Sequence, residues 1–320
     1  MAQRVRTVVV GGGSMGANHA RVLASHPATE LLAIVDIDPR RGRQLAESHG
    51  AVHHESIDEV GDFDAAVIAV PTEAHHEVAV PLLERGVPLV VEKPLAVDPG
   101  HVAEMLAAAS SGGAPLMCGF VERFNPAVMT VMDLLDEEPL YLSAVRHSPS
   151  AERIDTSVVH DLLIHDVDLA LRIFSQGVSG TPDARLRSSP EGIVQQSDVL
   201  IGFDGGGTAN ISASRLSQRK VRTISVATAG SLYEIDLLRH DLTVYRHRSE
   251  TQIDQGGPTY RAETLVDIPF VRHQGEPLML QLSHFVDLVR GEVDPAEELA
   301  TIVGPHEVVA TVDAAAAAAH

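Results

Sequence analysis

Three glycines follow directly on a β-branched run near the start of the chain. Gly11, Gly13 and Gly16 spell G-x-G-x-x-G between a predicted strand over residues 4–10 and a predicted helix over residues 14–25. In that setting the first glycine permits a tight turn, the second lets the backbone approach a pyrophosphate, and the third lets strand and helix pack closely. The helix N-terminus adds N–H groups and a partial positive charge for phosphates. The pattern predicts a dinucleotide-binding turn rather than a flexible turn in an open sheet.

Apolar strand-like runs alternate with helical segments through the first part of the chain. Further strands are predicted over residues 31–37, 65–70, 87–91 and 116–120, and helices over residues 40–49, 75–85 and 99–110. Continuous apolar strands joined by helices are typical of a parallel sheet covered on both faces. The fold class is therefore α/β, and we expect a doubly wound Rossmann domain over residues 1–120.

The second half of the chain is patterned differently. A strongly apolar helix is predicted over residues 158–174, and runs of alternating polarity follow between residues 199 and 268. Such alternation is typical of an antiparallel sheet with one buried face. We expect a second α/β domain over residues 121–320, with an open, mostly antiparallel sheet and a loop over residues 252–259. The C-terminal helices are expected to pack back on the first domain.

Charge and composition exclude several classes of protein. The 320 residues include 44 acidic against 24 basic ones, a formal net charge of −20, which repels nucleic acid and anionic membranes. No apolar run approaches the length of a membrane span, and the N-terminal apolar stretch is too short for a signal peptide. The one cysteine, Cys118, cannot form an internal disulfide. We expect a cytoplasmic protein that binds neither nucleic acid nor membrane.

A carboxylate follows the second predicted strand. Asp36 lies twenty residues after Gly16, where an acidic side chain bonds the adenosine ribose hydroxyls of a dinucleotide. The same charge repels a 2′-phosphate, so NAD is expected over NADP. Arg40 and Arg41 weaken this preference without reversing it.

Lysine is scarce in this chain and occurs only at Lys93 and Lys220. Arginine does not release a proton near neutral pH, so a lysine here is a candidate for a task that arginine cannot perform. Lys93 stands in Glu92-Lys93-Pro94, at the carboxyl end of a predicted parallel strand, where open α/β sheets bind ligands. There it can hydrogen-bond a substrate hydroxyl, or simply form a solvated pair with Glu92. Lys220 is interpreted as part of a surface cluster at a strand end.

Polar residues recur at helical spacing on the apolar helix of the second half. Asp161, His165, Asp168 and Arg172 fall at i, i+4, i+7 and i+11, which predicts one polar line on one helix face. Histidine has a pKa suited to taking a proton at neutral pH, and Asp161 can orient the imidazole or bind a substrate hydroxyl. A solvated helix face is the alternative. His160 lies nearby, but the spacing is not that of a zinc site and no metal is expected.

Four segments occur in a fixed order: residues 11–19 (GGGSMGANH), 71–75 (PTEAH), 92–96 (EKPLA) and 161–165 (DLLIH). Together they resemble the Gfo/Idh/MocA oxidoreductases, relatives of glucose–fructose oxidoreductase and inositol dehydrogenase. The resemblance covers nearly the whole chain. It implies a Rossmann domain, then an α/β domain whose open sheet often serves as an oligomer interface. It also implies NAD(P)-dependent oxidation of a secondary alcohol, with Lys93, Asp161 and His165 as the catalytic residues.

The resemblance also places other residues. Thr72 stands where the family more often has asparagine, and residues 119–126 resemble members that act on nucleotide-linked sugars, such as nucleotide-sugar 3-dehydrogenases. The expected cofactor residues are Gly11, Gly13, Ser14, Met15, Gly16, Asp36, Ile37, Arg40, Val70, Pro71, Thr72, His75, Glu92 and Lys93. The expected substrate residues are Lys93, Arg123, Asn125, Arg146, Asp161 and His165. Arg123, Arg146 and Arg153 either face a diphosphate or form salt bridges.

These residues predict a dehydrogenase for a sugar, nucleotide-sugar or cyclitol. Hydride passes between a substrate carbon and nicotinamide C4, His165 takes the hydroxyl proton, and Lys93 stabilises the charge on the substrate oxygen. Two alternatives stay open: a redox-neutral enzyme with tightly bound NAD that epimerises or eliminates through transient oxidation, and a non-catalytic dinucleotide-binding regulator. A homo-oligomer, dimer or tetramer, is expected through the C-terminal sheet.

Overall fold

The computed structural model describes residues 3–150, 156–254 and 257–318. The chain divides into two compact units. The first unit comprises the residues up to Val121 together with Glu276–Ala310, and the second comprises Glu122–Gly275 together with the residues from Thr311 onward. The C-terminal helix α8, Pro295–Ala318, therefore contributes residues to both units.

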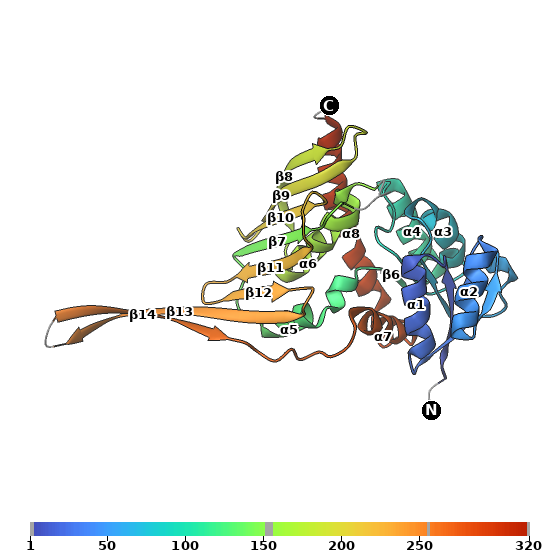
Figure 1. Ribbon diagram of the computed structural model, residues 1–320, viewed down its shortest axis with the longest axis horizontal. Coiled ribbons are helices and arrows are strands. Elements are labelled where there is room, and N and C mark those ends of the chain that lie inside the picture. The colour runs from blue at the N-terminus through green and yellow to red at the C-terminus, as the bar shows by residue number, and fades with distance from the viewer. Residues whose placement is uncertain (1–2, 151–155, 255–256, 319–320) are drawn as a thin grey trace. The chain divides into compact units, whose positions relative to one another are not determined.

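The first unit is built on a six-stranded parallel sheet, as the alternating pattern predicts (Figure 1). Its order is β3-β2-β1-β4-β5-β6, so the chain reverses its direction of progress between β1 and β4. Ligands of open α/β sheets bind at the carboxyl ends of the strands beside such a switch point. The strands are β1 Val5–Val10, β2 Thr29–Val35, β3 Val52–His54, β4 Ala65–Ile68, β5 Leu89–Val91 and β6 Leu116–Cys118.

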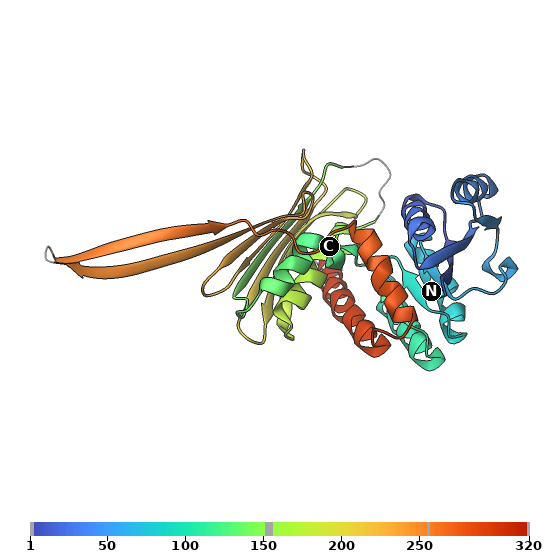
Figure 2. The ribbon, with the colours of Figure 1, turned by 90° about the horizontal axis from the view of Figure 1, so that it is seen from below.

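Helices cover both faces of this sheet (Figure 2). Strand connections are right-handed, so the helices joining β1 to β3 lie on the opposite face from those joining β4 to β6. Side-chain caps start two of the helices, because Asp38 accepts the N–H groups of Arg40 and Arg41, and Asp98 accepts that of Gly100. The helices are α1 Ser14–Ser25, α2 Pro39–His49, α3 His75–Glu84, α4 Pro99–Gly112, and α7 Pro277–Val289 from the later part of the chain.

The second unit holds an eight-stranded sheet in the order β14-β13-β12-β11-β7-β10-β9-β8. All neighbours are antiparallel except β7 and β10, which confirms the expected mostly antiparallel sheet. The strands are β7 Tyr141–His147, β8 Val178–Ser188, β9 Val194–Phe203, β10 Thr208–Ser214, β11 Val221–Ala227, β12 Leu232–Asp236, β13 Asp241–Asp254 and β14 Gly257–Asp267.

One face of this sheet packs against α5, Pro126–Leu134, and α6, Ile164–Phe174 (Figure 2). Burial alternates accordingly along β7, where Leu142 and Ala144 are buried and Tyr141 is exposed. Among the described residues, no helix lies over the opposite face. Within the same ranges, no helix is both long and apolar enough to cross a lipid bilayer.

The two strands β13 and β14 extend beyond the other six as an arm (Figures 1 and 2). Their pairing runs from Val244↔Asp267 to Asp254↔Gly257. The expectation of a loop over residues 252–259 is therefore wrong for the described part of that segment. Glycine and proline there stand at the end of a ladder, where a missing N–H costs little, rather than inside a long loop.

Candidate active site

The glycine turn between β1 and α1 is shaped by close backbone contacts. Gly11 has φ +99°, and a Cβ on it would meet Ala69 O at 2.5 Å. A Cβ on Gly16 would lie 1.7 Å from Gly11 O, so the helix can pack this close only on glycine. Gly13, in contrast, has open space where its Cβ would point. It is the N-cap of α1, and no side chain caps that helix. The N–H groups at the start of α1, next to Ser14 and Met15, thus fit a phosphate of a dinucleotide.

Asp36 is a buried carboxylate at the end of β2. It accepts the backbone N–H groups of Gly12 at 2.6 Å and Asp38 at 2.8 Å. Arg41 adds two hydrogen bonds, from Nε at 2.8 Å and Nη2 at 2.7 Å. Burial raises the pKa of Asp36, but the bonds from Arg41, Asp38 and Gly12 outweigh it, and the pKa lies below its ordinary value. Because these four bonds occupy the carboxylate, a ribose would have to displace the Arg41 side chain, which is 49% exposed.

The remaining expected residues near the adenosine end are exposed. Ile37 is 86% exposed and Arg40 is exposed at the start of α2. Each can contact a ligand without moving the core.

Three buried histidines surround the segment that carries Lys93, and each comes from a different helix. His19 on α1 is fully buried and places Nε2 2.6 Å from Glu92 Oε1. His75 on α3 has Nδ1 3.0 Å from Pro94 O. His306 on α8 accepts the backbone N–H of Leu95 with Nε2 at 2.9 Å. Backbone and side-chain atoms of residues 92, 94 and 95 are thus fixed on both sides of Lys93.

His75 also contacts the segment of residues 70–72, which is expected to bind the cofactor. His75 Nε2 lies 3.0 Å from Val70 O, next to Pro71 and the short helix Thr72–Ala74. His75 therefore links the end of β4 to the Lys93 segment. Burial lowers the pKa of His75, and its hydrogen bonds to Pro94, Val70 and Leu95 oppose that shift.

Glu92 is held as a carboxylate. Burial raises the pKa of Glu92, whereas the hydrogen bond and charge of His19, followed by the charge of Lys93, lower it more, so that it lies below its ordinary value. Glu92 Oε2 also accepts the backbone N–H of Lys93 at 3.3 Å. A Cβ on Gly119 would sit 3.0 Å from this carboxylate, so glycine is needed there for the fit.

In the second unit, Asp161 lies in a π-helical segment, Val159–Leu163, that precedes α6. The N–H of Ile164 bonds Val159 O five residues earlier. A π-turn changes the angular step between residues and frequently occurs at functional sites. Asp161 Oδ2 accepts a hydrogen bond from Arg215 Nη2 at 2.6 Å. The Arg215 side chain is 3% exposed and also donates to Thr156 O.

The expected polar line along this helix is not continuous. Asp161 and His165 are partly exposed, but Asp168 is buried and Arg172 is exposed. Asp168 forms a bidentate pair with Arg123, from Nε at 2.9 Å and Nη2 at 2.6 Å. The π-turn and this ion pair separate Asp161 and His165 from the other two residues.

The sequence left two roles open for three arginines, contact with a diphosphate or a salt bridge. The two that the structure describes form salt bridges with carboxylates. Arg123 binds Asp168, and Arg146 binds Asp166 and Glu122 at 2.8 and 2.9 Å. Arg153 lies outside the described residues.

Asn125 has a local structural task. Its side chain caps α5 by accepting the Ala127 N–H and donates to Leu237 O at 3.0 Å.

Sequence reasoning missed three residues at these sites, of which His19 lies at the end of the segment 11–19. Arg215 follows β10 and His306 lies within α8, and neither stands in a recognisable motif. His306 is 211 positions from Leu95 in the chain, so no local spacing predicts the contact.

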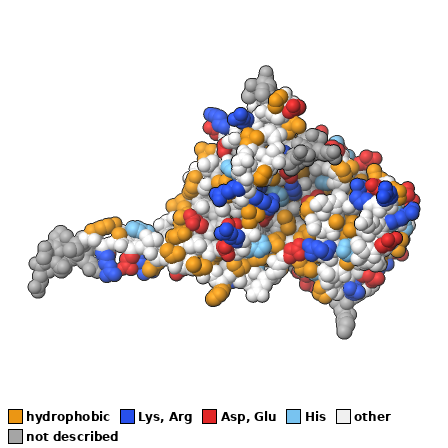
Figure 3. Space-filling view, viewed as in Figure 1, with side chains coloured by type: hydrophobic (Ala, Val, Ile, Leu, Met, Phe, Trp, Pro, Cys, Tyr) orange, Lys and Arg blue, Asp and Glu red, His pale blue; other side chains and the backbone are white. Residues whose placement is uncertain are grey.

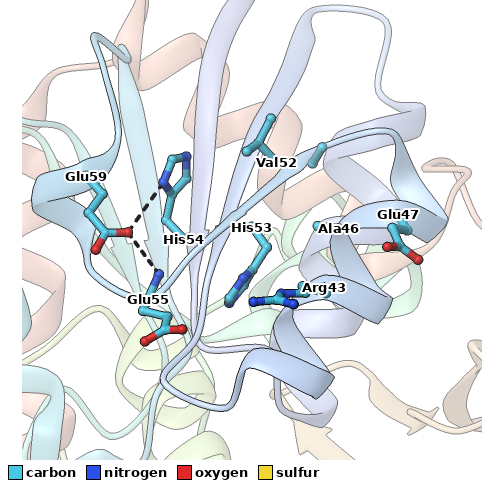
Figure 4. Close-up of a pocket in the computed structure, with 9 residues that line it drawn as sticks. Arg43, Ala46, Glu47, Val52, His53, His54, Glu55 and Glu59 are labelled. Atoms are coloured by element: carbon cyan, nitrogen blue, oxygen red, sulfur yellow. Dashed lines mark hydrogen bonds and ion pairs between the residues drawn. The ribbon is translucent and has the colours of Figure 1, made fainter.

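A separate hollow of about 620 Å³ lies between α2 and β3 (Figure 4). It is lined by Arg43, Ala46, Glu47, Ala51, Val52, His53, His54, Glu55 and Glu59. His53 Nε2 lies 3.0 Å from Asp36 O, but no residue of the glycine turn or the Lys93 segment lines the hollow.

Comparison with known proteins agrees with these observations. Residues 5–120 match the model of the GFO_IDH_MocA family, described as an oxidoreductase family with an NAD-binding Rossmann fold. Inositol 2-dehydrogenase 1 of Paenarthrobacter aurescens is 30% identical over 227 residues, which cover 66% of this chain and 67% of the relative.

A second relative is similar in sequence and in structure. UDP-N-acetylglucosamine 3-dehydrogenase of Acidithiobacillus ferrooxidans is 26% identical over 253 residues, covering 77% of this chain and 79% of the relative. Its solved structure superposes with a TM-score of 0.84 at 24% identity, covering 98% of this chain and 99% of that one. The structure of GenD2 from gentamicin A biosynthesis, in complex with NAD, has a TM-score of 0.82 at 23% identity and covers 100% and 96%.

The Rossmann sheet lies within the range matched by the family model, and the two-sheet architecture agrees with the solved structures. The chain belongs to the Gfo/Idh/MocA family of oxidoreductases with an NAD-binding Rossmann fold.

Proposed function

We propose that this protein oxidises a secondary alcohol of a sugar, nucleotide-sugar or cyclitol to a ketone, or runs the reverse reduction, with Lys93, Asp161 and His165 at the reacting group. The observation that carries the proposal is the clamp of three buried histidines on the Lys93 segment. Burying this many polar groups around one lysine costs free energy unless each group finds a hydrogen-bond partner. Such an arrangement is expected where the position of the lysine matters for function. The relatives named as inositol and nucleotide-sugar dehydrogenases support the substrate class.

The proposed chemistry divides between the residues and the cofactor. When bound, the nicotinamide exchanges a hydride with the substrate carbon. His165 takes the proton of the substrate hydroxyl during oxidation, as a general base. Lys93 donates a hydrogen bond to the same oxygen and stabilises its developing negative charge.

Asp161 is proposed to orient the reacting groups as a fixed carboxylate. Arg215 holds Asp161 Oδ2 at 2.6 Å, and the Asp161 side chain is 32% exposed. A carboxylate anchored by a buried arginine keeps its charge and direction, which suits a group that accepts a hydrogen bond from the imidazole or from a neighbouring hydroxyl.

We also propose NAD rather than NADP as the working cofactor. The lowered pKa of Asp36 keeps a negative charge at the end of β2, where a 2′-phosphate would be repelled. Gly11, Gly13 and Gly16 would hold the pyrophosphate with the N-terminus of α1.

The test is a substrate screen with the whole chain and NAD+, read as reduced cofactor formed. We expect turnover with at least one sugar, nucleotide-sugar or inositol. Lys93→Ala and His165→Ala should each lower kcat by about 100-fold or more while NAD affinity changes little. Wild-type turnover in either variant overturns the assignment of that residue.

Two other outcomes identify the alternatives. Product formation without a net change in reduced cofactor, with NAD retained through purification, indicates a redox-neutral enzyme. NAD binding without turnover of any substrate indicates a regulator.

A further inference from the structure

Five charged side chains lie at one end of the central strands of the second unit. Arg146 on β7 and Arg222 on β11 are directly opposite each other across the antiparallel pair. Like charges in this position repel each other unless carboxylates lie between them. Two carboxylates do so here, Glu122 and Asp166.

Most of the hydrogen bonds that these carboxylates accept come from Arg146. Asp166 accepts Arg146 Nε at 2.9 Å and Nη2 at 2.8 Å, and Glu122 Oε1 accepts Arg146 Nη1 at 2.9 Å. Arg222 shares only that last oxygen, through Nη1 at 3.2 Å. Its side chain is 30% exposed, and its Nε and Nη2 donors have no acceptor among the described residues.

Lys220 adds a third cation immediately before β11. It is exposed and has no hydrogen-bonded or ionic partner in the described part of the chain. Within the described part of the chain, the carboxylates paired with this group of cations, Arg146, Arg222 and Lys220, are Glu122 and Asp166, which leaves one positive charge in excess. Asp161 also acts on Arg222, but it is paired with Arg215. In a chain with a net charge of −20, a local surplus of positive charge is unusual. In the view of Figure 3, basic side chains lie on both units, interspersed with acidic ones.

The pKa of Lys220 agrees with an excess of positive charge in the cluster. The pKa of Lys220 lies below its ordinary value, chiefly because of the charge of Arg222, with smaller effects of burial and Arg146. The pKa of Arg222 is lowered by burial and then by Arg146. The shift of Lys220 is thus caused chiefly by a neighbouring positive charge, which a bound anion would offset.

The cluster lies in register with the residue that holds Asp161. Ser214, next to Arg215, pairs with His147 at the end of β7, and His147 pairs with Val221, next to Lys220. The backbones of Arg215 and Lys220 are therefore separated by two strand spacings, about 10 Å. This distance is comparable to the length of a pyranose ring with a phosphate on its anomeric oxygen.

We propose that Lys220 and Arg222 bind a phosphate or diphosphate group that the substrate carries next to the sugar ring. This inference rests on the proposed function, in which Asp161 lies at the reacting alcohol, and it narrows the substrate to a glycosyl phosphate or nucleotide-sugar. Two cations with several unused donors suit the many oxygens of a phosphate better than the two oxygens of a carboxylate.

The test measures equilibrium binding of UDP-N-acetylglucosamine to the whole chain by calorimetry, with Lys220→Gln as the variant and Arg219→Gln as its control. Both changes remove one exposed positive charge from the same loop, and neither disturbs the core. We expect Lys220→Gln to weaken binding about tenfold, as for the loss of one charge-assisted contact, and Arg219→Gln to change it less than about twofold. Added salt should weaken binding less in Lys220→Gln than in the wild type.

Two further probes identify the anion. Binding of N-acetylglucosamine 1-phosphate should depend on Lys220 in the same way, whereas the affinity for NAD should not change. Equal binding by the Lys220 and Arg219 variants, or no binding of either phosphorylated sugar to the wild type, overturns the proposal. Glucuronate binding that depends equally on Lys220 also overturns it, in favour of a carboxylate site. If no substrate reduces NAD+ but binding still depends on Lys220, the proposed oxidation fails while the anion site stands.

Arg222→Lys provides a second variant, because it keeps the charge near Glu122 but loses the planar fork of donors. We expect it to weaken binding of UDP-N-acetylglucosamine while the affinity for NAD is kept. An unchanged affinity would remove Arg222 from the site.

Discussion

His306 Nε2 accepts the backbone N–H of Leu95 at 2.9 Å, while its Nδ1 donates to Ile302 O within α8. This bonding fixes the imidazole as the neutral form with its proton on Nδ1. A helix from the far end of the chain thereby supports the strand end that carries Lys93. Lys93 is thus held through its neighbours on both sides.

Replacing His306 should damage both stability and activity. In His306→Ala the buried N–H of Leu95 loses its acceptor, which costs about 1–3 kcal/mol of unfolding free energy. We also expect a lower kcat with little change in NAD affinity, since Lys93 loses part of its support. Urea unfolding and steady-state kinetics measure the two effects. The partly exposed His49→Ala serves as control, and equal behaviour of the two variants would contradict the role of His306.

The pH dependence of stability should report the state of Glu92. Its pKa in the folded protein lies below the ordinary value of 4.5, so its contribution is complete above about pH 4.5 and is lost as the pH falls through the folded pKa. Glu92→Gln removes this contribution. We expect the difference in unfolding free energy between wild type and Glu92→Gln to be largest near neutral pH and to shrink below pH 4.5. A difference that stays constant down to the acid transition would show that the carboxylate is not stabilised in this way.

Asp36 and Arg41 should affect the two cofactors in opposite directions. Asp36→Ala removes the ribose acceptor and the repulsion of a 2′-phosphate, so NAD should bind more weakly and NADP relatively better. Arg41→Ala frees the Asp36 carboxylate from the bidentate pair and should strengthen the preference for NAD. Fluorescence titration with NADH and NADPH measures both ratios. Arg43→Ala on the same helix is the control, and unchanged ratios in the Asp36 variant would remove Asp36 from the cofactor site.

Arg215 should act on turnover through Asp161. Arg215→Ala leaves the Asp161 carboxylate without its buried partner at 2.6 Å, and we expect kcat to fall about 10- to 100-fold with a small change in KM. The kcat of the variant should also have a different pH dependence, because the charge next to Asp161 has changed. Arg215→Lys should restore part of the activity. A variant with normal kcat and only reduced thermal stability would assign Arg215 a purely structural role.

The helix-free face of the eight-stranded sheet is proposed as a contact between copies of this chain. Leu200 on β9 is 48% exposed and pairs with Asn210 on β10 on that face. Leu200→Asp should lower the mass measured by light scattering from a dimer or tetramer towards a monomer, since a buried unpaired carboxylate opposes association. Leu238→Asp, an exposed leucine outside the strands, is the control. A wild-type chain that is monomeric at micromolar concentration would end this proposal.

Local patterns predict the parts of this protein that depend on nearby residues. The glycine turn and Asp36 follow one strand–helix–strand unit, so their spacing alone indicates their geometry. The same holds for the alternation along β7, which identifies its buried face.

Other features depend on distant residues or on small changes in helix geometry. The contact between His306 and Leu95 joins distant parts of the chain, and no local pattern marks it. The π-turn at Val159–Leu163 disrupts the i, i+4 spacing that the polar line assumed. For Arg146, the sequence left two equal alternatives, contact with a diphosphate of a ligand or a salt bridge. Only the fold brings Glu122 and Asp166 next to Arg146.

The arm of β13 and β14 belongs to the same hydrogen-bonded sheet as β7, but every side chain from Tyr260 to Asp267 is exposed. Its ladder therefore gains little from apolar burial and relies on backbone bonds and cross-strand pairs such as Arg246 with Asp267. We therefore expect the arm to open independently of the core strands, and its backbone amides to exchange with solvent long before those of β7 and β10. One continuous sheet would then combine two parts that open separately. The central strands would stay closed while the arm at the edge opens without unfolding the protein.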